Sequence, residues 1–317
     1  MMRLADFDSL ITPIHRKYFT DNYYNAPEKQ YTSIFKVEDM GKPSESKQHL
    51  GGFGHPLANV EGGTINVAEM SEGDSASYTS QRYDLGYIVT HELMTYSLDP
   101  EVFGGAGVAV NKNGEKKNVG NAPQLLGAGY AEFEEIEAAG VLTGGFDNTG
   151  YDGLALFSAS HTLADSGETA SNLISGALTP GKVKEGLSLM RSDSRSEANV
   201  KKVIRAEKLV VPEGLEWDAD EIMFSQKQAH EFSNTKNSIT KVEPVVNDFL
   251  TMNTDTNVAT NWFLVSSQIE NLLFAWLERP WFDCQIIPMK VDLFYFGYMH
   301  FTATYVNWRG LVGSTGA

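Results

Sequence analysis

The sequence has few of the residues that disulfide-bonded or membrane-bound proteins need. Only one of its 317 residues is a cysteine, Cys284, so no disulfide can form within the chain, and a reducing compartment is expected. The apolar runs, such as Leu272–Leu277, are far shorter than the ~20 residues of a membrane-spanning helix. The N-terminal segment lacks the apolar stretch of a signal peptide. These features predict a protein that is made and kept in the cytosol, away from membranes.

Positive charge is also scarce. The chain has 25 lysines and arginines against 41 aspartates and glutamates, a formal net charge of −16. Proteins that bind nucleic acid usually carry a basic patch or stripe, whereas this sequence has only isolated basic pairs, Lys116-Lys117 and Lys201-Lys202. The composition therefore argues against a simple nucleic-acid-binding protein.

Recognisable catalytic and ligand-binding motifs are missing as well. Ser160 and His161 are adjacent, but the segment has neither an orienting acid nor the G-x-S-x-G elbow of a serine hydrolase. The glycine-rich GGAG segment lacks the lysine of a phosphate-binding loop. The glutamates at 132, 134, 135 and 137 have no histidine on the same predicted helix, as carboxylate metal sites do. We expect these glutamates to form a solvated or inter-subunit face, and we predict no catalytic residue, cofactor or metal.

Two strand-like segments flank a long polar stretch near the N-terminus. Residues 31–37 and 77–93 have strand-like patterns, whereas residues 41–74 are rich in glycine, serine and charge. Long loops of this kind in a compact domain are usually functional or disordered. The pattern predicts an extended hairpin. It either reaches a neighbouring molecule or is a flexible surface loop.

The rest of the chain mixes helices and strands. Asn121 and Thr179 are placed as N-caps of predicted helices at 121–140 and 179–190, each followed closely by proline. A further helix is expected at 219–232. Strands are expected at 209–211, 242–250 and 262–266, and aromatic strands at 285–289 and 292–305. This mixture predicts an α+β protein.

The first 25 residues carry scattered aromatic side chains. Two interpretations stay open: an arm that lies on another surface, or a helix at 9–21 that packs on the chain's own core. In the first, these side chains belong to a contact surface: Phe7, Tyr18, Phe19, Tyr23 and Tyr24.

An ordered set of segments between Tyr151 and Ser267 carries a family resemblance. The segments are YDGLALFSASH, LMRS, KLVVPEGLEWDADEI, NTKN and NWFLVSS. Their order and spacing resemble the major capsid proteins of tailed bacteriophages, in particular the Mu-type major head subunit. The resemblance is best from about Asn121 to Ser267. The ends of the chain resemble the family only in their general character.

The resemblance implies the Hong Kong 97-type phage capsid fold, an α+β fold. Its parts would be an N-terminal arm at 1–40, an extended loop at 41–85, a peripheral domain at 86–153 and 279–317, and an axial α/β domain at 154–278. The spine helix of the peripheral domain would lie at about 121–142. The predicted helix is short for a spine helix, and the loop that precedes it is long.

The implied function is self-assembly as hexamers and pentamers into an icosahedral shell that encloses double-stranded DNA without sequence-specific binding. An acidic wall suits this because like charges repel. The implied partners are further copies of the chain, a separate scaffolding protein, a portal and in some systems a decoration protein, with assembly in the host bacterial cytoplasm. Besides the N-terminal aromatics, the expected inter-subunit contacts are His49, Leu50, Phe53, His55, Leu57 and Val60.

Three alternatives belong to other classes. An encapsulin-like nanocompartment would have the same fold and enclose enzymes. A cytosolic hydrolase would use Ser160 and His161. A minor head or decoration protein would be separated from the major subunit by its copy number in the particle.

Overall fold

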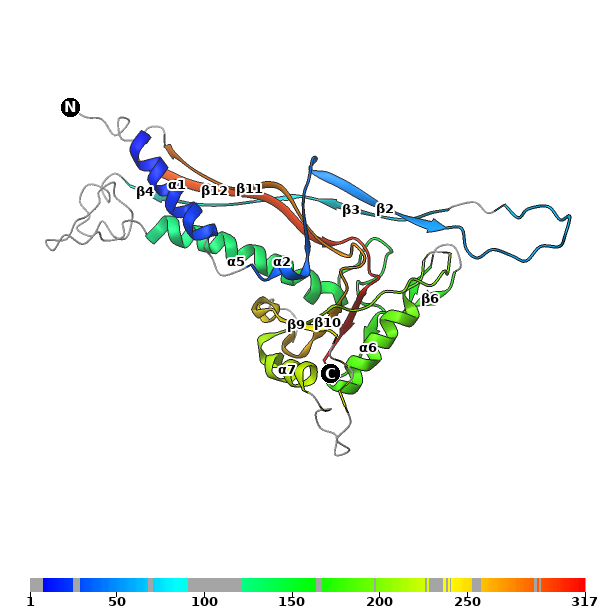
Figure 1. Cartoon of the computed structure of the whole chain (residues 1–317). Coiled ribbons are helices and arrows are strands. Elements are labelled where there is room, and N and C mark those ends of the chain that lie inside the picture. The colour runs from blue at the N-terminus through cyan, green and yellow to red at the C-terminus, as the bar shows by residue number, and fades with distance from the viewer. Residues whose placement is uncertain are drawn as a thin grey trace, which may run out of the picture. The chain divides into compact units, whose positions relative to one another are not determined.

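The computed structural model describes residues 8–24, 29–67, 71–90, 121–163, 167–196, 198–225, 227, 236–237, 239, 241–252, 258–287, 290 and 292–316 (Figure 1). The chain divides into two compact units. Unit 1 consists of Met1–Lys29, Ser80–Glu135 and Trp276–Thr302, and unit 2 consists of Gln30–Thr79, Ile136–Ala275 and Ala303–Ala317. None of the described helices is long and apolar enough to cross a membrane. Phe7 and the GGAG segment lie outside the described residues.

Long antiparallel strands form the framework of unit 1. Strand β4 (Gln81–Val89) pairs with β12 (Leu293–Tyr305) in a register that runs from Leu293↔Val89 to Phe301↔Gln81. Buried and half-buried residues alternate along β12 as far as Phe301, as expected of a strand with one covered face. With β11 (Leu272–Ile286) and β1 (Lys36–Asp39), which belongs to unit 2, these strands have the order β1-β11-β12-β4.

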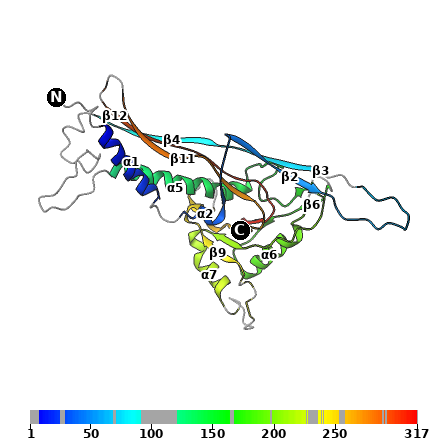
Figure 2. The same cartoon turned by 45° about the horizontal axis from the view of Figure 1, so that its top comes forward.

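Two helices accompany these strands in unit 1. Helix α1 (Asp8–Tyr24) lies along α5 (Asn121–Thr143), as Figures 1 and 2 show. A Cβ atom on Gly127 of α5 would come within 2.7 Å of the Phe19 carbonyl oxygen, so glycine lets the two helix backbones approach closely. Phe19 is buried and stacks on Phe282, with its edge toward Tyr130. The N-terminal helix therefore packs on the core of its own unit, as the second of the two open interpretations expected.

The glutamates of α5 are not all on a solvated face, so this part of the sequence prediction is wrong. Glu134 is 0% exposed and accepts hydrogen bonds from Tyr23 Oη at 2.5 Å and Lys29 Nζ at 2.6 Å. The Lys29 ammonium also lies 4.0 Å from the centre of the Tyr23 ring. Glu135 is buried too, whereas Glu132 is exposed. Glu134 can be buried because a cation and a phenol from the N-terminal segment satisfy its carboxylate.

Unit 2 is built on a five-stranded mixed sheet. The strand order is β7-β13-β10-β8-β9, with β10 antiparallel to β13 and β8 and with parallel pairs at both edges. The bounds are β7 (Leu173–Ile174), β8 (Lys208–Val211), β9 (Glu243–Val246), β10 (Trp262–Val265) and β13 (Leu311–Ser314). Short strands β5 (His161–Thr162) and β6 (Thr169–Ala170) form a separate pair.

Two helices cover the core of unit 2. Helix α6 (Pro180–Asp193) begins as predicted: Thr179 Oγ1 accepts a hydrogen bond from the Lys182 backbone, and proline occupies the first position. Helix α7 (Glu216–Phe224) packs against β8 and β9. Figures 1 and 2 show α6 and α7 as two separate helices beside the sheet. Side chains of both helices join one apolar cluster with β8 and β10, which includes Val183, Met190, Ile222, Leu209, Trp262 and Leu264.

Several boundaries differ from the sequence prediction. Residues 31–37 are not one strand: α2 (Tyr31–Ile34) is a helical turn that buries Tyr31 and Ile34, and β1 follows it. The helix expected at 219–232 begins earlier, at Glu216, and ends at Phe224. Part of the strand expected at 242–250 is a 3-10 turn, η4 (Asp248–Thr251), capped by the Asn247 side chain. The other 3-10 turns are η2 (Gly144–Phe146), η3 (Glu213–Leu215) and η5 (Val258–Thr260).

Strand β11 is the largest difference. It has 15 residues, where sequence reasoning placed a strand only from Gln285 onward. This strand contains Pro280, which cannot donate a ladder hydrogen bond. Strand β11 lies between β12 and β1, and β1 has only 4 residues. Among the described strands, most of β11 therefore has only β12 beside it, and an edge position tolerates proline.

We predict that Glu134→Ala lowers the free energy of unfolding by about 3 kcal/mol, because it removes the buried acceptor shared by Tyr23 and Lys29. Glu132→Ala, an exposed position on the same helix, is the matched control and should change stability by less than about 0.5 kcal/mol. Urea denaturation followed by circular dichroism measures both. Equal effects of the two substitutions would contradict the buried interaction.

Candidate functional site

A hairpin of unit 2 forms a sheet of its own. Strand β2 (Ser44–Gly52) pairs antiparallel with β3 (Ser71–Thr79), and among the described strands neither joins a third. The ladder is regular from Ser44↔Thr79 to Gln48↔Ser75 and irregular beyond Gln48. An isolated two-stranded ribbon is marginally stable at best, because it has no core. The hairpin therefore depends on contacts at its base and on whatever covers its far end.

The far end of the hairpin exposes apolar side chains. All residues from His55 to Val67 are exposed. Leu57, Val60, Ile65 and Val67 are 73%, 78%, 83% and 89% exposed, and Leu50 and Phe53 precede them at 59% and 65%. Single exposed apolar residues are common, but six on one short segment are typical of a surface that another molecule covers. We call Leu50, Phe53, Leu57, Val60, Ile65 and Val67 the hairpin surface.

Alternating charges hold the base of the hairpin. Lys47 of β2 donates to Glu38 at 2.7 Å and to Glu270 at 2.8 Å. Lys36 of β1 is ion-paired with the same two carboxylates. Hydrogen bonds from Lys36 and then Lys47 lower the pKa of Glu270 from 4.5 to about 2, and the hydrogen bond to Glu270 raises the pKa of Lys36. These four side chains fix β2 to β1 and to the segment that leads into β11.

His49 also anchors the base. Its Nε2 lies 2.6 Å from the Val306 carbonyl oxygen, and its ring lies 5.4 Å from the Tyr151 ring. On β3, Tyr78 is buried, and its hydroxyl donates to Glu45 at 3.4 Å. The hairpin is thus held by its own unit up to about His49 and exposed beyond that residue.

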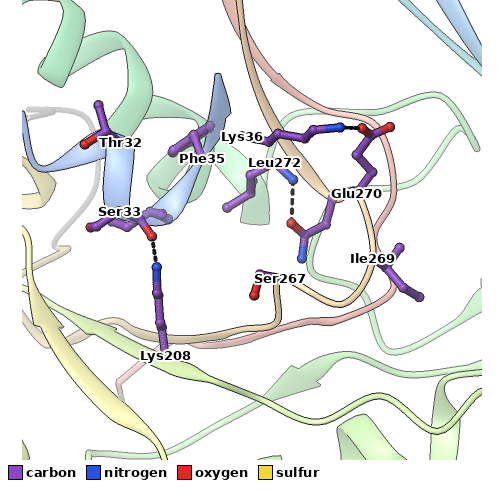
Figure 3. Close-up of a pocket in the computed structure, with 11 residues that line it drawn as sticks. Thr32, Ser33, Phe35, Lys36, Lys208, Ser267, Ile269, Glu270 and Leu272 are labelled. Carbon is purple, nitrogen blue, oxygen red and sulfur yellow. Dashed lines mark hydrogen bonds and ion pairs between the residues drawn. The ribbon is translucent and has the colours of Figure 1, made fainter. Parts of the chain in front are cut away.

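A pocket of about 480 Å³ lies beside the ion-pair network. Figure 3 shows Lys36 pointing to Glu270 and Lys208 pointing to the Ser33 carbonyl oxygen, with Ser267 between them. Both lysines of the lining are therefore engaged by oxygens of the protein. Its lining contains neither histidine nor cysteine, and no group of three or more His, Cys, Asp or Glu in the described part of the chain could hold a metal ion. The pocket thus offers no evident nucleophile and base pair.

The Ser160–His161 pair does not form a catalytic arrangement. His161 is 1% exposed, and its Nδ1 lies 2.6 Å from Asp152 Oδ2. Its Nε2 lies 3.2 Å from both Leu156 O and Asn172 Oδ1, and the ring stacks on Trp308 at 4.3 Å. Both ring nitrogens are therefore occupied by groups other than the exposed Ser160. His161 orders the turn around it and is not placed to act as a base.

The predicted contact residues fall into four groups. Phe7 lies outside the described residues, and Phe19 and Tyr23 are covered by the chain's own side chains. Tyr18 and His49 are half-buried. The exposed ones are Tyr24, Leu50, Phe53, His55, Leu57 and Val60. Sequence reasoning missed Ile65 and Val67, which the alternating segment T-I-N-V could have indicated.

Unit 1 carries an apolar groove of about 410 Å³. It lies between β4 and α5 and is lined by Leu85, Tyr130, Phe133 and Met299, with Arg82 and Asp84 among the polar lining residues. The Tyr130 hydroxyl is held by the Leu85 backbone N–H at 2.7 Å and donates to Gly297 O at 2.5 Å. Burial raises the pKa of Tyr130 to about 12. The hydroxyl is therefore fixed in its neutral form, and the groove presents mainly apolar surface.

Comparison with known proteins gives one family. The family model described as "Phage capsid protein" matches residues 76–313. No curated protein matches the chain.

Solved structures share the fold at low sequence identity. The mature capsid of bacteriophage PhiM1 matches with a TM-score of 0.57 at 8% identity, over 89% of this chain and 84% of that one. The capsid of cyanophage P-SCSP1u matches with a TM-score of 0.54 at 9% identity, over 89% and 86%. A chain of Microbacterium phage Oxtober96 matches with a TM-score of 0.53 at 10% identity, over 90% of both chains. These similarities confirm the predicted α+β Hong Kong 97-type fold.

We predict that Glu270→Gln destabilises the protein at pH 7 and that its difference from the wild type closes between pH 4.5 and about 2. The pKa of Glu270 is lowered in the folded state, so the stabilisation is present above pH 4.5 and lost as the pH falls toward about 2. Thermal melting of both proteins across this pH range measures the difference. Glu278→Gln, at an exposed position, is the control. A stability difference between Glu270→Gln and the wild type that stays constant down to pH 2 would contradict the lowered pKa of Glu270.

Proposed function

Since the chain belongs to the phage capsid protein family, it is a structural capsid protein and not an enzyme, and we propose that its copies form the hexamers and pentamers of an icosahedral head around double-stranded DNA. The observation that carries the proposal is the match over residues 76–313, which includes most of both units. The Mu-type subtype and the assembly in the host cytoplasm are part of the same proposal.

The hairpin surface is proposed as an inter-subunit contact. Burying a large aliphatic or aromatic side chain contributes roughly 1.5–3 kcal/mol, so these six side chains would contribute substantially to each contact. Contacts that are individually modest become strong when many copies assemble. The apolar groove of unit 1 on a neighbouring copy, lined by Leu85, Tyr130 and Phe133, is a receptor of matching chemistry.

The division into capsid domains follows from the resemblance and stays a proposal. We assign the arm to 1–40, the extended loop to 41–85, the peripheral domain to 86–153 and 279–317, and the axial domain to 154–278. The hairpin β2–β3 and helix α5 support the loop and spine-helix assignments. Of the N-terminal aromatics, Tyr24 is 63% exposed and is the best-placed contact residue, because Phe19 and Tyr23 are buried.

The remaining partners follow from the chemistry of a container. A net charge of −16 suits a wall that repels the DNA it encloses. A separate scaffolding protein, a portal and an optional decoration protein complete the proposed set.

We expect the purified chain, alone or with proteins from neighbouring head genes, to form shells, rings or tubes of a repeating subunit. Negative-stain electron microscopy with light scattering detects them, and the nucleic-acid content of particles from infected cells distinguishes a DNA head from an enzyme-filled compartment. A monodisperse monomer or dimer under every condition would overturn the proposed function.

Charge placed on the hairpin surface should block assembly without unfolding the subunit. We predict that the triple variant Leu57→Asp, Val60→Asp and Ile65→Asp melts within a few degrees of the wild type, because all three side chains are exposed. It should form no shells, since buried unpaired carboxylates are strongly unfavourable. Thr64→Asp, an exposed polar position in the same segment, is the control and should assemble. Normal shells from the triple variant would exclude the hairpin surface from the contact.

A further inference from the structure

A second apolar surface lies on helix α7, away from the hairpin. Trp217 and Phe224 are 78% and 70% exposed, whereas Ala219, Ile222 and Met223 face the core of unit 2. Residues seven apart lie on the same face of a helix, so the two aromatic rings belong to one outward face. Large exposed aromatic side chains of this kind are typical anchors of protein interfaces.

Carboxylates surround the two rings. The twelve residues Glu213–Phe224 contain five acidic residues and neither lysine nor arginine: Glu213, Glu216, Asp218, Asp220 and Glu221. We call this surface the acidic aromatic face. An aromatic surface with this rim matches a partner that offers apolar contact and positive charge.

Unit 2 itself presents such a surface. In the segment Lys201–Arg205, Val203 is 65% exposed and Lys201, Lys202 and Arg205 are exposed, whereas Ile204 is buried in the core. The backbone is held in place, because Lys202 N donates to Ser194 O at 2.8 Å and Arg205 N donates to Gln268 Oε1 at 3.3 Å. The segment therefore presents a valine among three cations on a fixed backbone, and we call it the basic segment.

The two surfaces lie at opposite ends of one strand. The basic segment ends just before β8 begins at Lys208, and the acidic aromatic face starts just after β8 ends at Val211. The two surfaces are therefore separate patches on one chain, with β8 between them. A contact that joins two different surfaces of identical chains is heterologous, and it closes into a ring when the rotation between copies allows.

We propose that, in the capsid rings, the acidic aromatic face of each copy binds the basic segment of the next copy. This inference rests on the proposed function and assigns the partner of a surface distinct from the hairpin. Trp217 and Phe224 pack on Val203 and on the methylene chains of the flanking cations, which can also lie over the aromatic rings. The charges around them set the direction and register of the contact.

Truncating the aromatic pair tests the anchor. The variant Trp217→Ala with Phe224→Ala should raise the protein concentration needed for ring and shell assembly by roughly tenfold or more, as loss of aromatic interface anchors does. Its melting temperature should stay near that of the wild type. Light scattering across a concentration series measures the concentration needed for assembly, and circular dichroism measures the melting temperature. Unchanged assembly with unchanged melting would overturn the inference.

Charge reversal tests the pairing itself. Variant A carries Glu213→Lys, Glu216→Lys and Glu221→Lys, and variant B carries Lys201→Glu, Lys202→Glu and Arg205→Glu. Each alone places like charges in every contact and should form no rings. A single chain with all six substitutions restores opposite charges in every contact and should recover both hexamers and pentamers.

The mixture of variants A and B gives a sharper result. Unlike charges meet throughout a ring only when A and B alternate, which an even number of subunits permits and an odd number does not. The mixture should therefore form hexamers and few pentamers, counted by mass photometry and electron microscopy. Assembly of A or B alone at the wild-type level, or failure of the six-substitution chain to assemble despite normal folding, would overturn the inference and leave the proposed function intact. A wild-type chain that never assembles would overturn both.

Discussion

The structure depends on one constraint: the β2–β3 ribbon has no core of its own. A two-stranded sheet cannot bury enough apolar surface to be stable alone, so it must be held from both ends. At the base, Lys36, Glu38, Lys47 and Glu270 alternate in charge and fix it to its unit. Beyond His49, the apolar side chains of the hairpin surface are exposed, and in the proposed head a neighbouring copy covers them. The same feature that weakens the isolated subunit therefore favours assembly.

The ion-pair network suits its place at the base of the hairpin. A surface ion pair alone contributes little, but here each of two lysines contacts both carboxylates. The lowered pKa of Glu270, about 2, keeps this carboxylate charged at any physiological pH. The base of the hairpin is thus held by charged groups, whereas its far end is exposed. The two proposed contacts differ in chemistry. The hairpin surface is apolar, whereas the α7 contact combines aromatic rings with charge.

Two polar residues, His161 and Glu134, have structural roles that differ from those the sequence suggested. His161 is held by Asp152, Leu156 and Asn172, which explains a Ser-His sequence without catalysis. Glu134, predicted to be solvated, is buried against Tyr23 and Lys29. In both cases the deciding partners are 5 to 111 residues away in the chain, so local sequence could not identify them.

The sequence by itself determined the α+β class, a helix that begins at Asn121, a helix capped by Thr179, the strands around Leu209 and Trp262, and the resemblance that led to the capsid fold. These features depend on local propensity, capping and short-range pattern, which adjacent residues specify. Only the tertiary structure decided that β11 continues through Pro280 and that Glu270 forms ion pairs with Lys36 and Lys47. It also decided which apolar side chains are covered: Phe19 and Tyr23 are buried, whereas Ile65, Val67 and Trp217 are exposed. The physical reason is that burial and charge pairing depend on which distant segments pack together, and the pattern of a single segment is compatible with several such arrangements.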